Sequence, residues 1–113
     1  MHFQTFSHTF TATGVGVQKR FVSIAGAQAI ATDVVLGVAK TDFKVGEAVT
    51  ADILGVVAVE SGAAIALGAG ITPDANGRAV TDPTAANGVA ANRVGYALNA
   101  VSAAGQTVFV LIR

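Results

Sequence analysis

The chain has 113 residues, a length that fits one domain, and it contains no cysteine, which excludes disulfides, thiolate zinc sites and cysteine nucleophiles. Charged residues make up 12% of the chain against a usual ~25%, and the net charge is zero, so we expect no basic surface for nucleic acid. Because so little charge favours self-association, we expect much of the surface to be covered in the working state.

The N-terminal segment is rich in phenylalanine and carries no Asp, Glu, Lys or Arg before Lys19. Alternate residues of an extended strand point to the same side, so Phe6, His8 and Phe10 share one face. The glycines of "TATGVGV" then predict a flexible joint. We therefore expect an extended arm over residues 1–18.

This arm is expected to dock on a neighbouring molecule through Phe3, Phe6, His8 and Phe10. An aromatic segment without charge suits a buried contact, because a buried charge would need a partner. The alternative is that the arm folds back as an edge strand of its own domain. His8 has no nearby carboxylate to complete a metal site.

Residues 19–113 are expected to form a β-rich domain. Glycine recurs through this part of the chain, and the short, valine-rich segments between glycines are typical of short strands and tight turns. The predicted fold class is all-β, a small β-barrel or sandwich. The expected strands are Arg20–Ile24, Val34–Ala39, Ile53–Val59, Arg78–Thr81, Arg93–Leu98 and Thr107–Ile112.

Several local patterns add detail to these strands. Val34–Ala39 and Ile53–Val59 are nearly continuous apolar runs, which predicts burial on both faces. The segment "TPDANGRAV" predicts a hairpin turn. A short helical turn is expected at Ala63–Leu67, and Phe109 is expected to be buried, in the core or in a subunit interface.

The sequence also contains a weak internal repeat. Val35–Leu54 and Arg93–Ile112 each carry a glycine inside a strand, then a linker with a second glycine, then another strand. This pattern indicates one strand–loop–strand unit used twice. Two copies are too few for a solenoid, so a barrel or a small sandwich fits better.

No pattern in the chain is typical of a catalytic, cofactor-binding or metal site. The glycines at 68 and 70 lack the third glycine of a dinucleotide fingerprint, and the carboxylates stand singly beside turn residues. The uncharged stretch between Glu60 and Asp74 is shorter than the ~20 residues of a membrane-spanning helix. We expect no enzyme activity, no cofactor and no membrane partner, with synthesis in the cytoplasm.

The segment "SGAAIALGAGITPDANGRAV" (Ser61–Val80) resembles the bacteriophage capsid cement, or head decoration, protein family. The preceding "DILGVVAVESG" and the terminal "VGYALNAVSAAGQTVFVLIR" also resemble this family, so the likeness covers about Arg20 to Arg113. It implies a homotrimer on the capsid exterior of the virion, bound to the major capsid protein and stabilising contacts between its subunits. The alternatives are a small β-barrel binding module of a phage tail or fibre, and a subunit of an enzyme that lacks chemistry of its own.

Overall fold

The structure is a computed structural model that describes residues 5–31, 33–82 and 93–112, and these residues form eight β-strands and no helix. All six predicted strands are present, and the largest difference in bounds is at β4, which begins five residues before the predicted start at Ile53. The strands are β1 (Thr5–Thr11), β2 (Phe21–Ser23), β3 (Val35–Ala39), β4 (Ala48–Glu60), β5 (Gly70–Pro73), β6 (Ala79–Thr81), β7 (Gly95–Ala97) and β8 (Thr107–Ile112).

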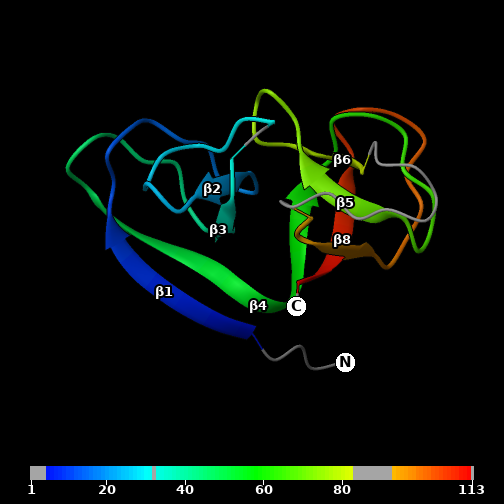
Figure 1. The fold of residues 1–113 in the computed structure, drawn as a ribbon, viewed down its shortest axis with the longest axis horizontal. Coiled ribbons are helices and arrows are strands. Elements are labelled where there is room, and N and C mark those ends of the chain that lie inside the picture. Colours follow the sequence, from blue (N-terminus) through cyan, green and yellow to red (C-terminus); the bar gives the residue numbers. More distant parts are fainter. Residues whose placement is uncertain (1–4, 32, 83–92, 113) are drawn as a thin grey trace.

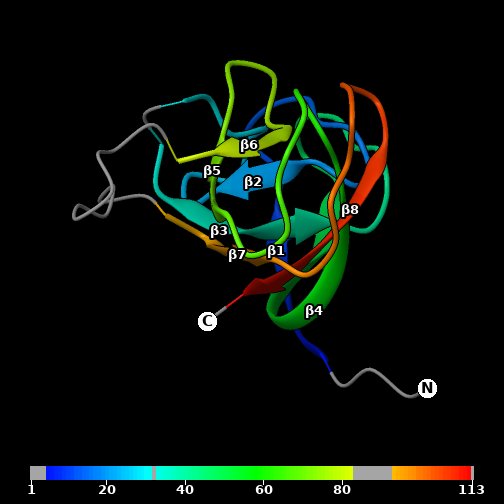
Figure 2. The same ribbon diagram turned by 90° about the vertical axis from the view of Figure 1, so that its right-hand side faces the viewer.

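The strands form one antiparallel sheet in the order β2-β3-β4-β8-β7-β5-β6, and β1 pairs with β4 beside this path. The two ends of the sheet approach each other, since the Phe21 N–H donates a 2.7 Å hydrogen bond to the carbonyl of Gly77 in the β5–β6 turn. The sheet therefore curves until it is nearly closed (Figures 1 and 2). The all-β prediction is confirmed, and the barrel describes the fold better than the sandwich.

The long strand β4 organises the sheet because its two halves have different neighbours. Its first half pairs with β1 and β3, and its second half pairs with β8. Gly55 pairs with both Thr5 and Ile112, so β1 and β8 meet end to end along β4. The predicted strand began at Ile53 and missed the first half, where Thr50 and Asp52 interrupt the apolar run.

The buried side chains form two separate cores on opposite sides of β2 and β3. Phe21 and Val38 face the large core, whereas their neighbours Val22 and Ala39 face the small core. The large core consists of Phe21, Ala29, Val38, Val57, Val59, Ile65, Ile71, Ala79, Val94, Ala97, Val108, Val110 and Ile112. The small core consists of Ala12, Val22, Ala39, Phe43 and Val49, with Phe10 packed against it.

Burial on both faces, predicted for two strands, is found only in part. It is present at the end of β3, where Gly37, Val38 and Ala39 are all buried. In the second half of β4, Val57 and Val59 are buried, while the alternate residues Val56, Ala58 and Glu60 stay partly exposed. This half of β4 is thus covered by the chain on its inner face alone.

The predicted hairpin turn is present between β5 and β6. One carboxylate oxygen of Asp74 accepts 2.8 Å hydrogen bonds from the backbone N–H groups of Asn76 and Arg78. Gly77 has a φ of 75°, a conformation that glycine adopts without a steric penalty. Local turn chemistry was sufficient to predict this hairpin.

The internal repeat is also visible in the structure, because β3 pairs with β4 as β7 pairs with β8. In each pair, the strand glycine lies against a backbone carbonyl of its partner. A Cβ on Gly37 would collide with the carbonyl of Asp52, and a Cβ on Gly95 would collide with that of Leu111. These glycines allow close approach of two backbones.

Two local predictions are wrong. Residues 63–67 form no helical turn, because Ile65 exchanges two 2.9 Å backbone hydrogen bonds with Val101 and so joins an isolated bridge. The strand β5 was missed because the residues on either side of Ile71 and Thr72 are Gly70 and Pro73, which favour turns.

Candidate functional site

The described part of the arm folds back onto its own domain as strand β1, which is the alternative left open above. Residues Ser7–Thr11 pair with the first half of β4 in regular antiparallel register. On one face, Ser7 donates a 2.9 Å hydrogen bond to Asp52, and the hydroxyls of Thr9 and Thr50 lie 3.0 Å apart. Pairing with β4 satisfies backbone groups that a detached arm would leave to water.

The structure describes only part of the set of four residues that we predicted to contact a partner. Phe3 lies outside the described residues, and the backbone of Phe6 pairs with Leu54. His8 is exposed beside the buried Ala51. Phe10 is half-buried.

The ring of Phe10 points into the domain and not toward solvent. It makes an edge-to-face contact with the ring of Phe43, with ring centroids 6.3 Å apart. Such aromatic pairs contribute about 0.5–1.5 kcal/mol beyond the burial of their area. In the isolated chain, Phe10 therefore anchors β1 to the small core.

The two glycines of the expected joint are constrained by packing. A Cβ on Gly14 would lie 2.8 Å from the Cβ of Ala27, and a Cβ on Gly16 would collide with the ring of Phe43. Gly16 also exchanges two 3.0 Å backbone hydrogen bonds with Phe43. The prediction of a flexible joint is thus corrected, since these glycines provide room for neighbouring side chains.

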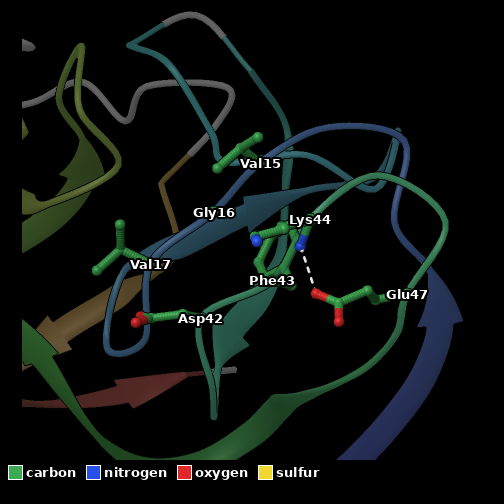
Figure 3. Close-up of a pocket in the computed structure, with 7 residues that line it drawn as sticks. All are labelled: Val15, Gly16, Val17, Asp42, Phe43, Lys44 and Glu47. Carbon is green, nitrogen blue, oxygen red and sulfur yellow. Dashed lines mark hydrogen bonds between the residues drawn. The ribbon is translucent and has the colours of Figure 1, made fainter.

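A hollow of about 290 Å³ lies beside this contact, and we call it the Phe43 hollow. Figure 3 shows Phe43 at its centre, with Val15 and Val17 on one side and Lys44 and Glu47 on the other. The Lys44 N–H donates a 2.7 Å hydrogen bond to the Glu47 carboxylate. Phe43 is buried and Val15 is 66% exposed, so the hollow presents apolar side chains next to the charged residues Lys44 and Glu47. It is lined by Val15, Gly16, Val17, Asp42, Phe43, Lys44 and Glu47.

A second apolar surface covers the outside of the sheet where β4, β8 and β7 lie side by side. Alternation along β8 turns Val108 and Val110 inward, which directs Phe109 outward. Phe109 is 41% exposed, so its predicted burial in the core of the chain is wrong. We call this surface the outer β8 face; it comprises Val56, Ala58, Leu98, Phe109 and Leu111.

Several charged groups of the described residues form ion pairs that join elements of the fold. Glu60 pairs with Arg20 at 3.2 Å and with Arg78 at 3.8 Å. Arg93 pairs with Asp82 at 2.7 Å and lies over the ring of Tyr96. Its hydrogen bond to Tyr96 has the largest effect on its pKa, followed by its hydrogen bond to Asp82, and both raise the pKa.

Within the described ranges, no cluster of His, Asp or Glu could hold a metal ion. The described residues form no helix, and therefore none that is long and apolar enough to cross a membrane. Among the described residues, exposed apolar surfaces lie beside β1, over β8, and around Ile24 and Val34. Sequence reasoning missed the surface beside β1, and for the surface over β8 it offered a subunit interface at Phe109 as one of two alternatives.

Comparison with known proteins completes this description. The family model of the phage cement proteins matches residues 2–112. No curated protein matches the chain. The crystal structure of the head fiber gp8.5 N base of bacteriophage phi29 has a similar fold, with a TM-score of 0.75, 21% sequence identity, and coverage of 97% of this chain and 95% of that chain. The match over nearly its whole length shows that this chain belongs to the phage cement protein family, with a structural, capsid-stabilising role.

Proposed function

We propose that this protein binds the exterior of a phage head as a homotrimer that clamps neighbouring subunits of the major capsid protein. The family match over residues 2–112 carries this proposal. The zero net charge and the exposed apolar surfaces support it, because a subunit completed by its neighbours needs little surface charge. Synthesis in the host cytoplasm and the absence of enzyme activity belong to the same proposal.

We assign the capsid contact to the arm, residues 1–18. Among the described strands β1 pairs with β4 alone, so a strand of the capsid protein can add to its other edge. His8 of β1 is exposed, the Phe43 hollow is lined in part by Val15 and Val17 of the arm, and Phe3 and Phe6 belong to the same segment. Phe10 does not contact the capsid protein in this proposal; its ring packs against Phe43 and stabilises the position of β1.

The contact is tested by binding the full chain to heads that lack this protein. Deleting the arm would uncover the small core, so single substitutions are preferable. His8→Asp and Val15→Asp each place a charge at the proposed contact, and each should weaken binding by about tenfold, or roughly 1.4 kcal/mol. Leu67→Asp is the matched control, because Leu67 is 69% exposed in a turn remote in sequence from the arm.

The outcome is measured by co-sedimentation with the heads and by cryo-electron microscopy of the decorated particle. Equal binding by the two arm variants and the control would show that the arm is not the anchor. A particle whose outer surface carries no density for this chain would contradict the proposed function as a whole.

A second candidate function is that of a base for a projecting fibre. It is favoured by the similarity in fold to the head fiber N base, which extends over 97% of this chain. The same cryo-electron microscopy distinguishes the two, because a fibre base would carry a second protein projecting outward from it.

A further inference from the structure

The turn between β5 and β6 contains a chemically reactive pair of residues, Asn76 followed by Gly77. Asparagine before glycine is prone to deamidation, because glycine has no side chain to obstruct attack by its backbone nitrogen on the asparagine side chain. The side chain of Asn76 is exposed, whereas Gly77 is buried. The amide that would be lost thus lies at the surface, and the nitrogen that would attack it lies inside the fold.

The reaction converts an amide into a carboxylate and consumes one water. The Gly77 nitrogen loses its proton to hydroxide and bonds to the side-chain carbon of Asn76. The bond from that carbon to the side-chain nitrogen breaks, and the nitrogen takes up a proton from solvent and leaves as ammonia. Water then opens the succinimide ring at one of its two carbonyls, which gives aspartate or isoaspartate. No oxidant, reductant or cofactor is needed.

The folded turn holds the attacking nitrogen in a hydrogen bond. The Gly77 N–H donates a 3.1 Å hydrogen bond to the carbonyl of Asp74, and the Asn76 N–H donates one of 2.8 Å to the Asp74 carboxylate. Ring closure requires the Gly77 nitrogen to lose its proton and to rotate toward the Asn76 side chain. The hydrogen bond to Asp74 must therefore break first.

Gly77 is also fixed on its other side, where the two ends of the sheet meet. Its carbonyl accepts the 2.7 Å hydrogen bond from the Phe21 N–H. A Cβ on Gly77 would lie 2.8 Å from the Cγ of Gln28 and 3.2 Å from the carbonyl of Ala29. Because the space around Gly77 is filled, the rotation that closes the ring requires Gly77 to separate from Phe21.

Ion pairs reinforce this junction, which we call the seam. The Glu60 carboxylate pairs with Arg20 before β2 and with Arg78 before β6, and so connects both sides of the seam. Arg20 also donates a 3.5 Å hydrogen bond to the carbonyl of Asn76. Replacement of Glu60 would therefore weaken the seam without changing either reacting residue.

We propose that Asn76–Gly77 is a deamidation site that the seam protects, so that Asn76 reacts only in molecules whose seam has opened. This inference goes beyond the proposed function and does not depend on it. The isoaspartate product carries one extra methylene in the backbone before Gly77. With this insertion, Gly77 can no longer make its hydrogen bonds with Asp74 and Phe21 together, and the seam of a modified molecule stays open.

The first test compares the folded full chain with the chain unfolded in guanidinium chloride, both in the same mildly alkaline buffer. Peptide mapping by mass spectrometry follows Asn76 separately from the second Asn-Gly pair of the sequence, Asn87–Gly88. Asn76 should react at least about tenfold more slowly in the folded chain, because only the open fraction reacts. Equal rates overturn the protection, and an Asn76 that does not react in the unfolded chain overturns the site.

The second test weakens the seam in the folded protein. Glu60→Gln should increase the rate at Asn76 by about two- to fivefold, the range expected when partly exposed ion pairs are lost. The matched control is Asp52→Asn, which changes a carboxylate to an amide at the 3.4 Å ion pair with Lys40 in the first half of β4. The control should react at the wild-type rate. A Glu60→Gln protein that reacts no faster than the control overturns the role of the seam.

The third test examines the product. The isoaspartate form, separated by chromatography, should unfold at a temperature lower than that of the unmodified chain by about 5 °C or more. Asn76→Asp carries the same new charge on a normal backbone and should unfold close to the wild-type temperature. An isoaspartate form as stable as Asn76→Asp would overturn the proposal that the modification leaves the seam open.

Discussion

The large and the small core are built from the same kinds of side chain but enclosed in different ways. The large core lies within the nearly closed sheet and receives side chains from most of its strands. The small core lies on the other side of β2 and β3, between the first half of β4 and the segments that carry Ala12 and Phe43. Figure 1 shows β1 along the first half of β4, far from β5 and β6.

The difference shows how a short chain supports an N-terminal strand. A 113-residue domain buries a limited fraction of its surface, so a second core of a few side chains contributes only a small stabilising free energy. The strand β1 depends on that core through the contact between Phe10 and Phe43. We therefore expect the large core to determine global stability and the small core to determine local opening of β1.

The largest effect is expected from Gly95→Ala, in the wall of the large core. The added Cβ would meet the carbonyl of Leu111, which is held in the sheet and cannot move aside. We expect a loss of about 3 kcal/mol or more in the free energy of unfolding, measured by urea denaturation. The control is Gly105→Ala, which meets no atom within 4 Å but has a φ of 83°, and it should cost about 1 kcal/mol. Equal losses would mean that backbone approach at Gly95 is unimportant.

Removal of the Phe21 ring is the next largest change. Phe21 is fully buried in the large core, so Phe21→Ala leaves a cavity and should cost about 3–5 kcal/mol. The loss should appear equally in circular dichroism and in hydrogen exchange of every strand, since global unfolding is affected. Exchange that accelerates only in β2 would show that the large core is not one cooperative unit.

The same truncation in the small core should have a smaller and more local effect. Phe43→Ala should cost about 2–3 kcal/mol, because the site lies beside an open hollow and can partly collapse. Amide hydrogens of β1 should then exchange much faster while those of β8 keep their protection. Uniform acceleration in both strands would contradict the division into two cores.

The smallest effect is expected at the seam that joins the ends of the sheet. Glu60→Gln removes the carboxylate that pairs with Arg20 and Arg78, all three side chains being about one-quarter exposed. Partly exposed pairs contribute about 1 kcal/mol or less, and salt screens them. The loss in thermal stability should shrink as ionic strength rises, and a loss that is independent of salt would point to packing.

Local chemistry was enough to predict much of the fold. The turn at Asp74–Gly77 depends on residues that contact one another within a few positions, and the strand β8 follows from the apolar run Val108–Ile112. The family resemblance rested on such segments, and the family match confirmed it. Polar alternation around Thr50 and Asp52 indicates the first half of β4, which apolar continuity by itself does not predict.

Three features were decided by tertiary structure. The alternation of β8 shows that Val108 and Phe109 point to opposite sides, but only the position of β8 in the sheet decides which side is covered. The arm could dock elsewhere or fold back, and its pairing depends on β4, a strand about forty residues away along the chain. The two cores lie on opposite sides of β2 and β3. The adjacent residues Phe21 and Val22 therefore enter different cores, and this assignment requires the sheet to curve around the large core. Each of these outcomes depends on contacts between distant parts of the chain, which local sequence patterns do not specify.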